Sequence, residues 1–270
     1  DAVKAISGGG LSKGMELKAK VKDQVGVKLI DWYRLRAGYG TAEEFRAFLK
    51  DNPAWPDRTL LVARMEEAIF TQGGTAAAIK EHFKTMPPAT GIGFAALASA
   101  YLIEGDEANA KANASKAWRE HNLPATLETG FLDRFRKLLE PADHKWRFDR
   151  LVMDDIRWRD ERNARATIAR RVVPLLSADE QKKAPGRIAL LVGGKTAVAA
   201  GGGSSEDWGA VFHRIQGLRR TKKIEEAAKL MLTAPTDAAK IVSPDDWWTE
   251  RRQLAYGALK LGKPKLAYDL

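Results

Sequence analysis

Two adjacent tryptophans and two adjacent arginines form the most distinctive chemical pattern in this sequence. They lie in residues 243–252, Ser-Pro-Asp-Asp-Trp-Trp-Thr-Glu-Arg-Arg, where Ser243 and Pro244 predict the start of a helix. An aromatic face complements the apolar face of a pyranose, so an exposed tryptophan could stack on a sugar ring. Adjacent side chains on a helix point about 100° apart, so at most one of Trp247 and Trp248 should be exposed. The candidate ligand-contact residues are therefore Trp248, Arg251 and Arg252.

Motifs for metal and nucleotide chemistry are missing from the sequence. The four histidines are never spaced i,i+4, and no His-Glu-x-x-His arrangement occurs, so no zinc site is predicted. Gly194, Lys195 and Thr196 suggest a phosphate loop, but that motif also needs a glycine at the position of Ala189. We therefore predict no catalytic residue, no metal site and no cofactor in this chain.

Composition indicates a basic globular protein. The chain has 270 residues, 44% of them hydrophobic, no cysteine and a net charge of +10, which favours polyanionic partners such as nucleic acid, acidic lipid or carboxylate-bearing cell wall. No nucleic-acid-binding module is recognisable, and we read the arginines of residues 157–171 as a solvated helix face paired with local acids. No apolar run approaches the roughly 20 residues of a membrane span.

Recurring helix start and stop signals predict an all-α fold. Thr41 and Glu44 form a capping box, and the Ser177–Glu180 spacing repeats it. Glycines such as Gly105 and Gly262 punctuate a recurring helix–turn–helix pattern. The pattern is typical of a right-handed superhelix, an α-solenoid of short antiparallel helix pairs like those of tetratricopeptide proteins. We expect one superhelical domain over residues 1–270, with a loose glycine-rich connection near residues 193–205.

Several segments together carry a family resemblance. They are residues 29–36 (Leu-Ile-Asp-Trp-Tyr-Arg-Leu-Arg), 48–56 (Phe-Leu-Lys-Asp-Asn-Pro-Ala-Trp-Pro), 143–151 (Asp-His-Lys-Trp-Arg-Phe-Asp-Arg-Leu), 207–235 and 243–252. In this order and spacing they resemble the N-terminal superhelical domain of soluble lytic murein transglycosylases. The resemblance implies a periplasmic parent enzyme that cleaves peptidoglycan glycan strands and leaves 1,6-anhydro-muropeptides. It also implies that this domain helps to bind or guide anionic peptidoglycan.

The catalytic residues of that family are not found in this chain. Its catalytic domain carries the acid in a Glu-Ser pair followed by Gly-Leu-Met-Gln, and the sequence contains neither. We therefore expect this segment alone to be inactive and its signal peptide to have been removed. Two other hypotheses stay open: a tetratricopeptide-like protein-interaction scaffold with no enzymatic parent, and an α-repeat protein that binds RNA. The expected partner is peptidoglycan, with protein partners as the alternative and no nucleic acid.

Overall fold

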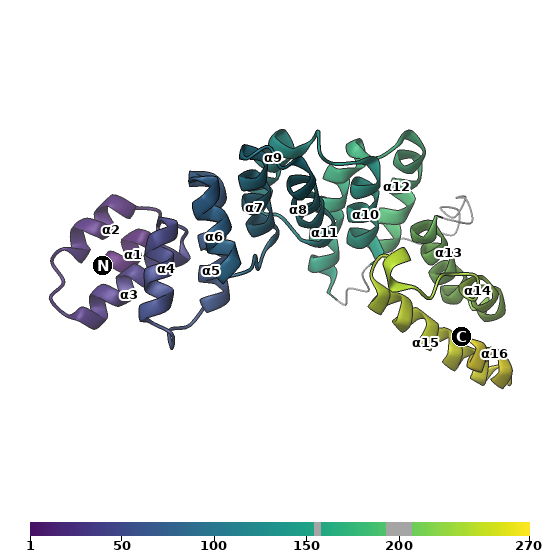
Figure 1. Cartoon of the computed structure of the whole chain (residues 1–270). Coiled ribbons are helices and arrows are strands. Elements are labelled where there is room, and N and C mark those ends of the chain that lie inside the picture. Colours follow the sequence, from purple (N-terminus) through teal and green to yellow (C-terminus); the bar gives the residue numbers. More distant parts are fainter. Residues whose placement is uncertain (154–157, 193–206) are drawn as a thin grey trace. The chain divides into compact units, whose positions relative to one another are not determined.

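The computed structural model describes residues 1–153, 158–192 and 207–270, and every regular element within them is helical (Figure 1). The predicted all-α class is confirmed. The chain divides into two compact units, Asp1–Leu139 and Glu140–Leu270. The glycine-rich connection predicted near residues 193–205 lies outside the described residues. Within the described ranges, no helix is both long and apolar enough to cross a membrane.

The N-terminal unit is built from helices that follow one another in chain order (Figure 1). Helices pack on those that are next or next but one in the chain: α5 contacts both α4 and α7, and α7 contacts α6 and α8. The helices are α1 (Ala2–Ser7), α2 (Leu11–Lys18), α3 (Gln24–Arg36), α4 (Ala42–Asp51), α5 (Arg58–Gln72), α6 (Ala76–Thr85), α7 (Gly91–Ile103), α8 (Glu107–Glu120) and α9 (Ala125–Phe135).

The C-terminal unit follows the same rule of sequential packing, since α13 contacts α14 and α14 contacts α15. Two short 3-10 turns, Val173–Leu175 and Ala238–Lys240, connect some of its helices. The helices are α10 (Pro141–Met153), α11 (Arg159–Val172), α12 (Ala178–Leu191), α13 (Trp208–Arg220), α14 (Ile224–Met231), α15 (Pro244–Lys260) and α16 (Pro264–Asp269).

Two tryptophans near the N-terminus pack between helices. Trp32 is buried, and its indole N–H donates to the Pro56 carbonyl oxygen at 3.1 Å. Trp55 is half-buried, with its ring 6.0 Å from Trp32 and 5.7 Å from Phe48, so it fills the space between α3 and α4. These contacts place Trp32 in the core of the N-terminal unit.

The predicted helix starts and ends are largely confirmed. Thr41 and Glu44 form the reciprocal capping box, with hydrogen bonds of 3.2 Å and 2.8 Å. Ser177 accepts from the Glu180 amide, but the Glu180 carboxylate binds the Lys183 ammonium group at 3.1 Å instead of returning to the cap. Gly105 and Gly262 have φ of +78° and +69°, the left-handed conformation that ends a helix at little cost only for glycine.

Replacing Gly105 with alanine is expected to lower the free energy of unfolding by about 1 kcal/mol. An added Cβ would meet no atom within 4 Å, so the loss would come from the positive φ alone. Gly130 lies inside α9 and is equally open around its Cα, without the positive φ. Gly130→Ala should therefore stabilise the chain slightly, since alanine favours helix. Urea unfolding of both variants checks the contrast, and equal effects of the two changes would contradict it.

A buried carboxylate fixes the start of α7. Glu66, on α5, accepts hydrogen bonds from the amides of Ala89 and Thr90 at 2.6 Å and 2.8 Å and from the Thr90 hydroxyl at 2.5 Å. Burial raises the pKa of Glu66, and these hydrogen bonds oppose the rise only in part. Gly93 lies so close that an added Cβ would collide with the carboxylate. Glu66 therefore serves as a cap that ties α5 to α7.

Candidate functional site

The two adjacent tryptophans at the start of α15 point in different directions. Trp247 is 1% exposed and packs on Phe212 with ring centroids 4.9 Å apart, in the core of the C-terminal unit. Trp248 is 63% exposed. Because consecutive residues are turned by about 100°, the helix that buries one must present the other to solvent. The prediction that at most one of the pair is exposed is confirmed.

The two predicted arginines also differ from each other. Arg251 reaches back into the unit, where its guanidinium donates to the carbonyl oxygens of Ala234 at 3.3 Å and Leu270 at 3.4 Å. Burial lowers the pKa of Arg251 from its ordinary value. Arg252 is exposed and has no ion pair or hydrogen bond within the described part of the chain. Arg252 is therefore the cation available to a ligand, whereas Arg251 is held by backbone oxygens.

Trp248 and Arg251 line a hollow of about 310 Å3 beside the start of α15. On the outer face of the helix, Arg252 and Tyr256 lie within about 80° of Trp248 around the axis. We call Trp248, Arg252 and Tyr256 the α15 face; Tyr256 is exposed like the other two. It combines two aromatic rings with one unpaired cation. Tyr256 was not predicted from the sequence, although its spacing of eight residues from Trp248 could have shown it.

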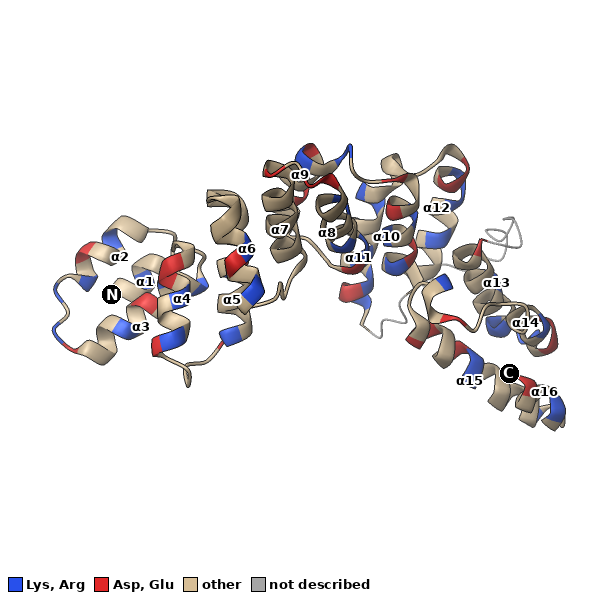
Figure 2. Cartoon of the chain, in the orientation of Figure 1, with Lys and Arg blue, Asp and Glu red and all other residues tan. Residues whose placement is uncertain are grey.

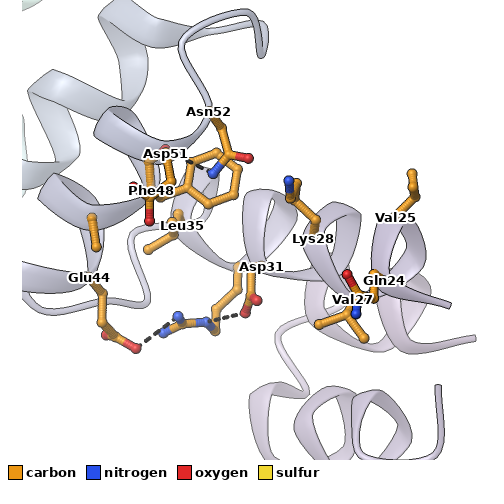
Figure 3. Close-up of a pocket in the computed structure, with 12 residues that line it drawn as sticks. Gln24, Val25, Val27, Lys28, Asp31, Leu35, Glu44, Phe48, Asp51 and Asn52 are labelled. Carbon is orange, nitrogen blue, oxygen red and sulfur yellow. Dashed lines mark hydrogen bonds and ion pairs between the residues drawn. The ribbon is translucent and has the colours of Figure 1, made fainter. Parts of the chain in front are cut away.

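A second hollow, of about 570 Å3, lies between α3 and α4 in the N-terminal unit (Figure 3). Leu35 and Phe48 are buried and form part of its floor. One wall is closed by Arg34, which bridges Asp31 at 3.6 Å and Glu44 at 2.9 Å. Lys18 also pairs with Asp31, at 2.5 Å, so two cations balance the two carboxylates and the hollow shows no clear preference for a charged ligand.

A cluster of buried ion pairs joins α10, α12 and α13; we call it the charge cluster. Its members are Lys145, Asp149, Glu180, Lys183, Arg187 and Asp207, together with His213. Lys145 contacts Asp149 and Asp207, each at 2.8 Å. Arg187 is 0% exposed and contacts Asp149 at 2.5 Å. Three cations face three carboxylates, so the charge cluster is neutral and pins three helices together.

The pKa values in the charge cluster follow from burial and pairing. Burial alone would raise the pKa of Asp207, but its hydrogen bonds to Lys145 and Lys183 outweigh that effect and hold the pKa well below its ordinary value. Burial, and then the positive charge of Arg187, lower the pKa of His213 well below 6.5. Its Nδ1 accepts from Arg187 Nε at 3.0 Å, which leaves Nε2–H to donate to the Val152 carbonyl oxygen at 3.1 Å. His213 is therefore neutral, with its proton on Nε2.

The C-terminal unit is expected to lose stability as the pH falls below about 6.5. His213 has a lower pKa folded than unfolded, so its contribution is full above the unfolded pKa and is lost as the unfolded state takes up a proton. Asp207, also lowered, extends the loss to more acidic solution. NMR of the His213 ring should show a neutral Nε2–H tautomer throughout the folded range. A ring that titrates near 6.5 in the folded protein would contradict this assignment.

One serine matches the spacing of a hydrolase nucleophile. Residues 10–14 read Gly-Leu-Ser-Lys-Gly, which fits the Gly-x-Ser-x-Gly spacing of a nucleophile elbow. An elbow needs a strand before the serine and a histidine base beside it. Here Ser12 is an exposed residue in the first turn of α2, a helix that follows another helix, and no histidine contacts it within the described ranges. The match carries no catalytic geometry.

A carboxyl group that acts as the general acid on a glycosidic oxygen needs a raised pKa, so that it keeps its proton, and it must be accessible to the substrate. Glu66 has the raised pKa, but it is almost fully buried and occupied by the amides of α7. The carboxylates of the charge cluster are paired with cations. No group of three or more potential metal ligands is found in the described segments. The α15 face, with its exposed aromatic rings and exposed arginine, remains the candidate site.

Basic residues are spread over helices of both units, with acidic residues among them (Figure 2). On α11 the predicted solvated arginine face is found in part: Arg159, Arg170 and Arg171 are exposed, whereas Arg162 and Arg165 are half-buried. Arg157 lies outside the described residues. Among the described residues, basic positions thus occur in both units and alternate with acidic ones.

Comparison with models of protein families, with curated proteins and with solved structures finds no match to this chain.

Proposed function

We propose that this chain is a non-catalytic binding domain for peptidoglycan, the superhelical arm of a soluble lytic murein transglycosylase in the periplasm. The parent enzyme would cleave glycan strands to 1,6-anhydro-muropeptides with a catalytic domain encoded elsewhere. The α15 face carries the proposal. It offers aromatic surface for a sugar ring and an unpaired arginine for the carboxylates of the wall, within a segment that resembles the family.

The fold supports the same proposal. Successive helices contact the next and often the next but one, as in α3 on α5, α5 on α7 and α10 on α12. Stacked helix pairs of this kind build a solenoid, and we propose that residues 1–270 wind into one right-handed superhelical domain. Such an arm offers an extended surface to a polymer, and its net charge of +10 suits an anionic one.

Co-sedimentation with purified sacculi tests the proposal. We expect the chain to pellet with sacculi at low salt, to be released as salt rises, and to prefer sacculi to RNA when both are present. Trp248→Ala should weaken binding about tenfold, as expected for an aromatic contact residue. Trp158, at the start of α11, is equally exposed and is not part of the α15 face, so Trp158→Ala is the matched control and should bind normally.

A protein-interaction scaffold is the second candidate, favoured by exposed apolar side chains near the end of the chain. Leu259 and Leu261 at the end of α15 and Tyr268 on α16 are all exposed. Apolar surface of this kind suits a protein partner better than a sugar polymer. If the folded chain does not bind sacculi at low salt, the scaffold hypothesis is favoured. If it binds RNA more tightly than sacculi, the RNA-binding hypothesis is favoured.

A further inference from the structure

A cavity in the N-terminal unit has the features of a small ligand site. Its volume is about 440 Å3, within the roughly 300–1,000 Å3 usual for ligand pockets. Its lining comes from the last turn of α5 and from α6, α7 and α9. The walls are mainly apolar, formed by Ile69, Phe70, Ile79, Ala96, Leu102 and Ile103.

Arg134 is the charged residue in this lining. Its Nη1 donates to the Ser99 hydroxyl oxygen at 2.9 Å, and its guanidinium carbon lies 4.7 Å from the centre of the Phe70 ring. Ser99 in turn donates to the Ala95 carbonyl oxygen at 2.9 Å, which leaves its oxygen to accept from Arg134. The guanidinium is therefore held in a defined orientation at the cavity.

The charge of Arg134 is not compensated. No aspartate or glutamate pairs with it in the part of the chain that the structure describes, and none lines the cavity. The other polar side chains of the lining are committed: Thr71 donates to the Glu67 carbonyl oxygen and Gln72 to that of Gly40. A guanidinium has five N–H donors, and one hydrogen bond to Ser99 leaves the others for a ligand.

A cavity with one uncompensated guanidinium and apolar walls suits a ligand that contains a carboxylate and an apolar group. A planar guanidinium binds a carboxylate through two parallel hydrogen bonds, which a cavity without competing acids would favour. At the rim, a Cβ at Gly73 would meet no atom within 4 Å. The Gly73 N–H donates to the Ile69 carbonyl oxygen at 3.1 Å, whereas the Gly74 N–H has no backbone partner among the described residues. A bare peptide group can hydrogen-bond a ligand main chain, which favours a peptide over a fatty acid.

We propose that this cavity binds the C-terminal end of a peptide, with Arg134 holding the terminal carboxylate and the apolar walls enclosing the last side chain. The site is independent of the α15 face and of the proposed function. The volume of about 440 Å3 accommodates the carboxylate together with an apolar last side chain such as that of alanine or valine.

Fluorescence anisotropy of the full chain with a labelled Gly-Ala-Ala-Val peptide tests the proposal. The free acid should bind at least tenfold more tightly than the same peptide with a C-terminal amide. Arg134→Gln should lower affinity for the acid at least tenfold and leave the weak binding of the amide unchanged. Arg136→Gln removes the same charge from the same chain segment outside the cavity and should have no effect.

A second pair of variants protects the test against misfolding of Arg134→Gln. Ile103 lines the cavity and is 68% exposed, so polar substitutions there should leave the fold intact. Ile103→Glu would offer Arg134 an internal carboxylate and should abolish the preference for the acid, whereas Ile103→Gln should retain it. Equal binding of acid and amide, no binding at millimolar peptide, or tighter binding of decanoate than of the peptide would each overturn the proposal.

Discussion

Asp149→Ala is expected to lower the free energy of unfolding of the C-terminal unit by about 3–5 kcal/mol, the usual cost of leaving one member of a buried ion pair alone. Arg187, its partner at 2.5 Å, is 0% exposed and would keep its charge with Glu180, at 3.8 Å, as the remaining carboxylate among the described residues. Lys145 would lose one of its carboxylates as well. Hydrogen exchange of α10, α12 and α13 should show the loss locally.

Two further variants separate the buried charge from general damage. Asp179 lies on α12, like Arg187, and pairs with Lys182 at 3.4 Å, but the side chains of both Asp179 and Lys182 are exposed. Asp179→Ala should leave the unfolding midpoint unchanged, since exposed pairs contribute little. Asp149→Leu combined with Arg187→Met should recover much of the lost stability, because it removes both buried charges. If the double variant is as unstable as Asp149→Ala, the charge argument is wrong.

Trp247→Ala is expected to destabilise the C-terminal unit by about 3–5 kcal/mol, as large-to-small changes of fully buried aromatic residues do. The ring packs on Phe212 within a core that includes Ile215, Met231 and Leu254, and its removal would leave a cavity there. The neighbouring Trp248 is mostly exposed, so Trp248→Ala should change stability by less than about 0.5 kcal/mol. Urea unfolding monitored by circular dichroism measures both variants.

The same pair should show the opposite order in binding. Trp248→Ala removes exposed aromatic surface while the fold persists, so it should reduce sacculus binding at unchanged stability. Trp247→Ala should affect binding only through the folded fraction. Loss of stability in Trp248→Ala, or none in Trp247→Ala, would show that the orientation of α15 is wrong.

Many helix boundaries could be predicted from short sequence motifs. The capping box at Thr41 and the glycine turns at Gly105 and Gly262 act within a few residues, so the predicted helix boundaries could be read without tertiary information. The orientation of Trp247 and Trp248 followed from helix geometry alone. These are the features in which prediction and structure agree.

Features that depend on packing between helices could not be predicted in the same way. Glu66 caps a helix that begins 25 residues later, and its partners are mainly backbone amides, which leave no sequence signal. In the charge cluster, the i,i+4 spacing of Lys145 and Asp149 is visible in the sequence, but the approach of Asp207 from α13 is not. The cavity at Arg134 likewise exists only once α5, α7 and α9 are packed together.

For the α15 segment, the sequence predicted correctly that at most one of the two tryptophans is exposed, but it did not distinguish the contacts of the two arginines. It named Trp248, Arg251 and Arg252 together, whereas the structure separates Arg251, held by the backbone of Ala234 and Leu270, from the exposed Arg252. The carbonyl oxygens of Ala234 and Leu270 lie 17 residues before and 19 residues after Arg251, and a sequence pattern does not reveal such long-range partners.

The most direct test of the central claim, binding of peptidoglycan without cleavage, is a single incubation of the chain with purified sacculi. The pellet is assayed for bound protein, and the supernatant is analysed by mass spectrometry for soluble fragments. The account predicts salt-sensitive binding in the pellet and no anhydro-muropeptides in the supernatant. Release of such fragments, or a folded chain that stays entirely in solution at low salt, would contradict it.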